Sequence, residues 1–367
     1  MYYSTNIFLC KSPFALSPAG SCPLFWFIFH FTFPLFHCIL IYYCIERGVP
    51  LDSFLFSIRA TAPVFLMMVL GYVLRQLGLL DPHFCKVSDK FVFTAALPAM
   101  LFRDMAATHL RETFDLPYIL FCAGVTTVVF FSLWGLARHF LRDKSLVGEF
   151  VQVSYRSSAA ILGCAIIQGI YGGTGMAPLM IIGSVPLFNI YAVLVLTIEG
   201  PTASGSLGHR LRHAGKGIVT NPIILGILLG VIPSLLGLNA FPPILDSTLD
   251  LLARVATPLA LLSLGASFQG KQALGKLRLS AGAAAIKLLL LPALFLPLAV
   301  YFGFTDSKLV ALIVMLGSTS TPTCYIMARS MGHEGTLTAS VVVLTTVCSA
   351  FSLTLWIFLG RQFGLIA

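Results

Sequence analysis

The chain has 367 residues, of which 57% are hydrophobic and only 10% are charged, and its formal net charge is +9. Soluble domains contain about 25% charged residues, so this composition, with a mean hydropathy of +0.92, excludes a water-soluble globular fold. The positive charge does not indicate nucleic-acid binding, because the basic residues form short clusters between apolar blocks and no stripe with interleaved aromatic residues. The sequence therefore predicts a membrane protein.

Residues 1–50 differ from the rest of the chain. Residues 22–44 form an aromatic-rich apolar run that lacks the small-residue cleavage site of a signal peptide. Residues 46–48 are what a purine-rich ribosome-binding sequence would encode, and Val49 or Leu51 would then be the first translated residue. We interpret 1–50 as an extension from a mis-called start. The alternative, an additional membrane helix, stays open.

Ten apolar blocks follow, each near the ~20 residues that a membrane helix requires. Backbone polar groups in lipid must be satisfied within a segment, so helices are expected, and the period-two alternation of a membrane barrel is missing from the sequence. The blocks lie near residues 54–76, 88–108, 117–137, 147–170, 176–198, 218–237, 244–268, 279–302, 307–328 and 336–360.

The loops between these blocks differ in charge. Those after odd-numbered blocks contain the basic residues Arg75, Lys86, Lys90, Arg138, Arg142, Lys144, Arg210, Arg212, Lys216, Lys271, Lys276, Arg278 and Arg329, whereas those after even-numbered blocks contain Arg103, Arg111, Lys308 and Arg361. Cytoplasmic loops carry the excess of Lys and Arg. We therefore expect a multi-pass protein of the cell (inner) membrane, with both ends of the ten-helix core facing outward.

An internal repeat relates the two halves. TAPVFLMMVLGYVLRQLGL (61–79) matches TNPIILGILLGVIPSLLGL (220–238) at an offset of 159, and AALPAML (95–101) matches VATPLAL (255–261) at an offset of 160. A repeat of five helices must cross the membrane in opposite senses in its two copies. This predicts inverted five-helix repeats over 51–200 and 217–367, joined by a Gly/Ser-rich, basic cytoplasmic linker at 201–216.

Polar clusters within the fourth and ninth blocks predict two broken helices at matching positions. Pro322 removes a backbone donor from the ninth block, and Ser158 matches Ser318 at an offset of 160. Half-helix N-termini in inverted-repeat carriers suit a carboxylate, although small hydroxyl residues are also common where membrane helices pack closely. The candidate substrate- or ion-binding residues are Arg156, Ser157, Ser158, Asn189, Asn221, Lys287, Ser318, Thr319, Ser320, Thr321, Pro322 and Tyr325.

Charged and amide side chains inside the blocks allow two interpretations each. Arg156 either attracts an anionic substrate and stabilises the broken helix, or extends to the cytoplasmic surface. Lys287 either pairs internally or takes part in proton or ion coupling. Asn189 and Asn221 either line the path or bond between helices. Nine cysteines without a CxxC pair predict no disulfide framework or metal site, and no cofactor is expected.

Several segments together resemble the auxin efflux carrier family, which includes bacterial malonate and other organic-acid carriers. They are LPAMLF (97–102), YRSSAAILG (155–163), YGG (171–173), TNPIILGILLG (220–230), TPLALLSLGASF (257–268), AIKLLLLP (285–292) and TPTCYIMARSMGHEG (321–335). The resemblance covers about residues 52–361. It implies a sodium/bile-acid symporter-like fold with crossed helices 4 and 9, an organic-anion site at their crossing, and a homodimer. Ser158 and Ala165 stand where the family has asparagine and proline. This departure weakens the transfer of substrate identity, and of the geometry of the first broken helix, from the family to this chain.

The sequence thus predicts a secondary active carrier of a small organic anion, such as a carboxylate or an auxin-like acid, in the lipid bilayer. Alternating access around the crossing of helices 4 and 9 would be proton-coupled or uniport. A sodium-coupled bile-acid-type symporter is the alternative on the same fold. A sodium site would require more intramembrane carboxylates or amides near the crossing of helices 4 and 9 than this sequence contains. A membrane-embedded enzyme and a non-transporting sensor are alternatives of other classes. The sequence shows no HExxH motif, paired carboxylates or Ser/His pair for an enzyme, and no loop long enough for the soluble domain of a sensor.

Overall fold

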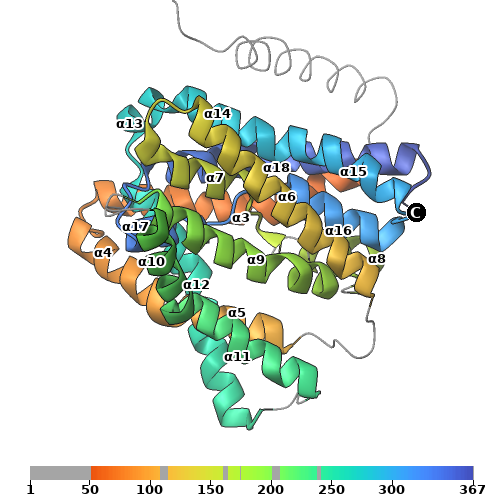
Figure 1. Ribbon diagram of the computed structural model, residues 1–367, viewed down its shortest axis with the longest axis horizontal. Coiled ribbons are helices and arrows are strands. Elements are labelled where there is room, and N and C mark those ends of the chain that lie inside the picture. Colours follow the sequence, from red (N-terminus) through yellow and green to blue (C-terminus); the bar gives the residue numbers. More distant parts are fainter. Residues whose placement is uncertain are drawn as a thin grey trace, which may run out of the picture. The chain divides into compact units, whose positions relative to one another are not determined.

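The computed structural model describes residues 51–107, 115–159, 164–173, 175–200, 207–237 and 241–366 (Figure 1). All of them belong to the second of the two units into which the chain divides, Arg47–Ala367. The predictions made for residues 1–50 and for the start of the linker at 201–206 fall outside the described residues. The regular structure within the described ranges is entirely helical.

Each predicted apolar block corresponds to one or more helices. In the first half these are α3 (Leu51–Gln76), α4 (Pro82–Phe91) continued by the π-helical η2 (Val92–Ala96) and α5 (Leu97–Ala106), α6 (Leu116–Phe140), the short η3 (Lys144–Leu146), α7 (Val147–Tyr155), α8 (Cys164–Tyr171) and α9 (Ala177–Ile198). In the second half they are α10 (Leu207–Thr220), α11 (Pro222–Leu236), α12 (Pro243–Ser267), α13 (Gly270–Gly275), α14 (Leu277–Ala285) continued by the π-helical η5 (Ile286–Leu290) and α15 (Leu291–Tyr301), α16 (Asp306–Gly317), α17 (Thr323–Ser330) and α18 (Thr336–Gln362).

Short local patterns explain where several of these helices begin. The Asp81 carboxylate accepts the backbone N–H of Phe84 in front of α4, and the Asp115 carboxylate accepts that of Tyr118 in front of α6. An acidic side chain at this position satisfies a backbone donor that the first turn leaves free. A proline follows each cap, where its missing N–H costs no hydrogen bond.

Five helices are long and apolar enough to cross a membrane, among the residues that were placed: α6, α9, α12, α18 and the continuous Leu277–Tyr301. A sixth arises if Ala214–Thr220 and Pro222–Leu236, bent by 54°, form one span. Several other helices are interrupted, so that each piece is too short to cross alone. The chain is therefore a multi-pass membrane protein.

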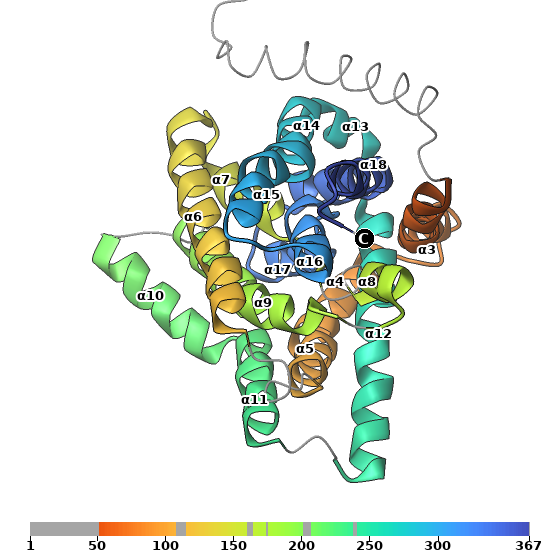
Figure 2. The ribbon, with the colours of Figure 1, turned by 90° about the vertical axis from the view of Figure 1, so that its right-hand side faces the viewer.

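The predicted linker contains a helix. The sequence predicted a Gly/Ser-rich connection over 201–216, but α10 begins at Leu207 and continues to Thr220, at an angle to α11 (Figure 2). Ala214 is fully buried, and Ile218 packs against the hydrophobic core. In the sequence, apolar residues recur at helical spacing through this basic segment, at positions 207, 211, 214 and 218, which is the pattern of an amphipathic helix.

Two helix pairs make equivalent close contacts. α3 packs against α12, and α5 packs against α11. A Cβ on Gly71 of α3 would overlap the carbonyl oxygen of Leu262 in α12, and a Cβ on Gly230 of α11 would overlap that of Phe102 in α5. Gly71 precedes Gly230 by 159 residues and Phe102 precedes Leu262 by 160, the two offsets of the sequence repeat. Contacts between the halves therefore follow the repeat.

A buried carboxylate joins α7 to the start of α18. Glu149 is 1% exposed, and its side chain accepts the backbone N–H groups of Gly335 and Thr338 at 2.9 and 3.0 Å. It also accepts the Thr338 hydroxyl at 2.8 Å. A negative charge at a helix N-terminus is stabilised by the free N–H groups and by the helix dipole. Glu149 thus fixes α18 against the first of the broken helices.

Candidate functional site

Two interrupted helices meet in the interior, at a place here called the crossing. α7 ends at Tyr155 and α16 ends at Gly317, and the residues after them, Arg156 and Ser318, have extended backbone conformations. The unwound segments are joined by the Ser158 N–H, which donates to the Thr319 carbonyl at 3.0 Å. The interruptions lie in the fourth and ninth apolar blocks, where the sequence predicted them.

The residue types explain why both helices stop. Serine and threonine side chains compete with the backbone for hydrogen bonds and disfavour a helix interior. Pro322 has no N–H, and proline pushes the preceding residue, Thr321, out of the helical region. Pro322 itself occupies the N-cap position of α17.

Several predicted hydroxyl residues hold the crossing together. The Ser320 hydroxyl donates to the Val153 carbonyl of α7 at 2.6 Å, and its N–H donates to the Thr345 hydroxyl of α18 at 3.1 Å. The Thr319 hydroxyl lies 2.9 Å from that of Thr346. Ser318 is fully buried next to them. The Ser320 and Thr345 hydroxyls thus satisfy backbone groups at the two breaks, whereas the Ser318 hydroxyl has no hydrogen-bond partner among the described residues.

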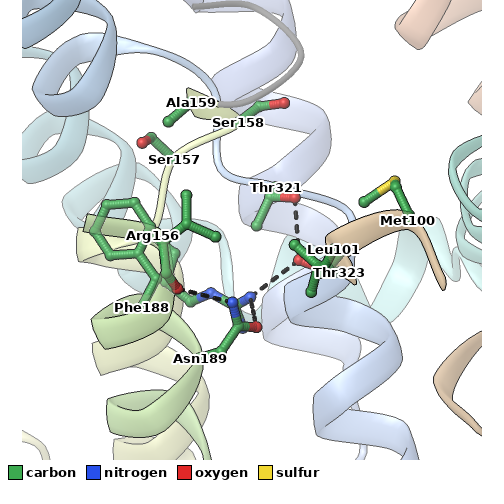
Figure 3. A pocket seen from close by; sticks show the side chains of 11 residues that line it. Met100, Leu101, Arg156, Ser157, Ser158, Ala159, Phe188, Asn189, Thr321 and Thr323 are labelled. Atoms are coloured by element: carbon green, nitrogen blue, oxygen red, sulfur yellow. Dashed lines mark hydrogen bonds between the residues drawn. The ribbon is translucent and has the colours of Figure 1, made fainter. Parts of the chain in front are cut away.

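Arg156 is a charged residue that directly follows the end of α7. It is 2% exposed, and its guanidinium donates to the Asn189 side-chain oxygen at 3.0 Å and to the Thr323 hydroxyl at 3.1 Å (Figure 3). A third contact, at 2.8 Å, is with the sulfur of Met327. All three partners are neutral, and among the described residues the arginine has no carboxylate within ion-pair distance. Among the described residues, no anion therefore compensates the buried positive charge.

A cavity of about 40 Å³ adjoins this guanidinium. Five of the predicted residues line it: Arg156, Ser157, Ser158, Asn189 and Thr321. The sequence did not single out the others, which are Met100, Leu101, Ala159, Val185, Phe188 and Thr323. Thr323 could have been found, because it belongs to the polar run around Pro322. The apolar residues have no distinguishing pattern within apolar helices.

Two atoms at this cavity lack a partner. Among the described residues, neither the Ser157 hydroxyl nor the Arg156 Nε makes a hydrogen bond. An unpaired buried polar atom is costly, so both are available to a polar ligand. Figure 3 shows the serines of the first break on one side of the guanidinium and Thr321 and Thr323 of the second break on another.

The other seven predicted residues do not line this cavity: Ser318, Thr319, Ser320 and Pro322 belong to the second break, and the remaining three lie elsewhere. Asn221 caps α11, where its side-chain oxygen accepts the Ile223 N–H at 2.9 Å. Tyr325 lines a second cavity of about 520 Å³, here called the vestibule, with Arg75 and Arg329 among its lining. Lys287 is fully buried behind the crossing. The structure thus separates these three from the residues around Arg156.

The Lys287 ammonium bonds to both broken helices. It donates to the carbonyl of Tyr155, the last residue of α7, and to that of Met315 in the last turn of α16, both at 3.0 Å. The carbonyls are 160 residues apart, which is the offset of the repeat. The Lys287 ammonium therefore pairs with a backbone carbonyl from each half of the chain. No group of three or more His, Cys, Asp or Glu suited to a metal occurs in the described ranges.

Comparison with known proteins gives one family and several relatives. The family described as "Membrane transport protein" matches residues 56–357. An "Uncharacterized transporter" of Methanothermobacter thermautotrophicus is 23% identical over 308 residues, 83% of this chain and 98% of that protein. A "Putative malonate transporter" of Rhizobium meliloti is 25% identical over 83% of this chain and 96% of its own. The "Uncharacterized transporter YfdV" of Escherichia coli K12 is 26% identical over 83% and 98%.

Proposed function

Because the chain belongs to the membrane transport protein family, that of the auxin efflux carriers, we propose that it is a secondary carrier of a small organic anion bound beside Arg156. The observation on which this rests is a buried guanidinium that lines a cavity and has only neutral partners among the described residues. A charge buried without a counter-charge is costly. An anionic substrate would supply the missing counter-charge.

The surroundings of Arg156 favour a carboxylate. Planar guanidinium groups bind carboxylates with paired hydrogen bonds, and the Ser157 hydroxyl adds a free donor. Thr321 and Thr323 lie at the N-terminus of α17, where the helix dipole favours negative charge. Met100, Leu101 and Phe188 would contact an apolar part of the substrate. The Rhizobium relative named for malonate is consistent with a small carboxylate substrate.

Transport requires this site to open. Arg156 is 2% exposed and the cavity beside it is small, about 40 Å³, so a substrate would reach the guanidinium only when the surrounding helices move apart. The vestibule, of about 520 Å³, lies at the C-terminal ends of α3, α12 and α17, which the basic residues assign to the cytoplasm. We propose that access alternates around the crossing, with the vestibule as the opening toward the cytoplasm.

We further propose ten membrane helices in two inverted repeats, with both ends of the core facing outward from the inner membrane. The reciprocal contacts of Gly71 with Leu262 and of Gly230 with Phe102 support this arrangement, because a pseudo-twofold axis makes such contacts in pairs. The breaks after Tyr155 and Gly317 support it as well. Paired discontinuous helices at the midplane are typical of inverted-repeat carriers.

Proton coupling or uniport fits the crossing better than sodium coupling. The described lining of the cavity contains hydroxyl, amide and guanidinium groups and no carboxylate. Sodium sites are built from oxygen ligands, and a guanidinium next to such a site would repel the ion. A sodium-coupled symporter is the alternative, and the experiment below distinguishes the two.

Uptake of labelled malonate and related carboxylates into proteoliposomes tests the proposal. Runs with a pH gradient, a sodium gradient and no gradient compare the coupling modes. We expect Arg156→Gln to abolish saturable uptake while the protein stays folded, because a neutral amide can still bond to Asn189 or Thr323. Arg254→Gln is the matched control: Arg254 is an exposed arginine of α12 that pairs with Asp250 at 2.6 Å. Uptake unaffected by Arg156→Gln would refute the assigned site, and uptake driven only by sodium would favour the alternative.

A further inference from the structure

The position of Lys287 leads to an inference about what holds the crossing together. Its side chain is fully buried on the π-helical turn η5, and its ammonium bonds to the carbonyls of Tyr155 and Met315. Within the described residues it makes no ion pair with a carboxylate. Among the described residues, the hydrogen-bond partners of the ammonium are therefore backbone carbonyls.

These carbonyls belong to two converging helix C-termini. The carbonyls of a last helical turn have no intrahelical donors, and the aligned peptide dipoles place about half a negative charge at that end. α7 and α16 both end here, so that two partial negative charges face one point. In inverted-repeat carriers, half-helix C-termini and unwound carbonyls are the groups that coordinate a coupling cation.

A single lysine serves both ends. Tyr155 and Met315 differ by the 160 residues of the repeat, so the ammonium lies on equivalent atoms of the two halves. The position equivalent to Lys287 in the first half is Thr127, whose hydroxyl bonds to the Ala123 carbonyl and lies 2.9 Å from the Tyr191 hydroxyl. Of these two equivalent positions, only Lys287 carries a cation, and its one ammonium bonds to the ends of both helices.

We propose that the Lys287 ammonium is a permanently attached cation that occupies the place a dissociable monovalent cation would take between the two half-helix ends. This inference rests on the proposed carrier function for its meaning in transport, but the bonds themselves do not depend on any substrate. The attached ammonium would make the wild-type protein independent of a dissociable cation at this place. Lys287 is a positioning residue, since it holds the breaks next to Arg156 without lining the cavity.

Removal of the ammonium should create a site for a small cation. Lys287→Ala leaves the Tyr155 and Met315 carbonyls unpaired in a space that the lysine side chain vacates. In choline chloride, whose cation is too large for this space, we expect the melting temperature to fall by about 5 °C or more, because two buried acceptors lose their donor. Sodium or methylammonium chloride at the same ionic strength should restore much of the loss.

Thermal unfolding of the purified full-length protein in the three salts is the primary measurement, and it requires no substrate. Lys308→Ala is the matched control. Lys308 lies in the first turn of α16, and its ammonium bonds to Asp115 in front of α6. The melting temperature of this variant should show no selective response to sodium or methylammonium. Lys287→Arg retains the charge and should keep the protein independent of the salt. Anion uptake by the same variants in the same salts should follow the melting temperatures.

The results separate this inference from the carrier proposal. A wild-type melting temperature that rises selectively with sodium would overturn the inference, as would a folded Lys287→Ala protein that responds to neither small cation. If Lys287→Ala folds in sodium or methylammonium but not in choline, the inference is supported, and failure in all three salts overturns it. Absence of anion uptake by the wild type would count against the carrier proposal alone, because thermal unfolding still reports on the cation.

Discussion

The paired helices α3–α12 and α5–α11 and the crossing of α7–α8 with α16–α17 are held together in different ways. At the paired helices, Gly71 and Gly230 let two backbones approach without a side chain between them. At the crossing, side chains bond to backbone groups that the helix breaks leave free. The first arrangement depends on shape, so a change of one methyl group is felt directly. The second depends on hydrogen bonds, which water or a substrate can replace.

The largest effect on stability is expected at the paired helices. Gly71→Ala and Gly230→Ala each place a Cβ onto a carbonyl oxygen of the neighbouring backbone, which cannot move aside as a side chain could. We expect each to lower the free energy of unfolding by about 3 kcal/mol. The measurement is thermal or denaturant unfolding in detergent.

Gly124→Ala in α6 is the control for these substitutions. A Cβ built there meets nothing within 4 Å, so the change should be neutral, or stabilising by up to about 1 kcal/mol through better helix propensity. If the three alanine variants unfolded alike, close backbone approach would not explain the packing of α3 on α12 and of α5 on α11.

A smaller effect is expected at the crossing. Ser320→Ala removes the hydroxyl that bonds to the Val153 carbonyl at 2.6 Å, and the buried acceptor loses its partner, which costs about 1–2 kcal/mol. Ser184 is an equally buried serine whose hydroxyl bonds to the Met180 carbonyl within its own helix. Ser184→Ala should cost less than about 0.5 kcal/mol, because that bond only supplements the helix. Equal losses for both would show that the bond across the crossing is unimportant.

The smallest effect is expected at a partly exposed ion pair that belongs to neither region. The Lys308 ammonium donates a hydrogen bond to Asp115, in front of α6, and lowers the pKa of that carboxyl below its ordinary value. A lowered pKa contributes stability above the ordinary pKa of about 3.9 that is lost as the pH falls through the lowered value. Because both side chains remain partly accessible to solvent, the contribution should be below about 1 kcal/mol.

Asp115→Asn tests this pH dependence, since asparagine can still cap the helix. The stability of the wild type relative to the variant should decline as the pH falls below about 4. Lys308→Gln and the double variant complete a mutant cycle that isolates the pair. A difference between wild type and Asp115→Asn that stayed constant with pH would contradict the lowered pKa.

Several features could be predicted from the sequence because they depend on local residue types. Serine, threonine and proline around Ser158 and Pro322 indicated the helix breaks. The spacing of apolar residues from Leu207 to Ile218 contained the evidence for α10, but the glycines and basic residues there suggested a flexible linker instead. The buried Arg156 was recognised as a candidate, because an arginine within an apolar block requires a polar environment.

What the sequence alone determined is the membrane environment, the apolar blocks, the repeat and the places where helices break, since each follows from composition or from neighbours along the chain. Only the tertiary structure decided the partners. Lys287 and Tyr155 are 132 residues apart, and Glu149 and Thr338 are 189 apart. No local pattern specifies such pairs, because they form only when helices from the two halves cross at a particular depth and angle.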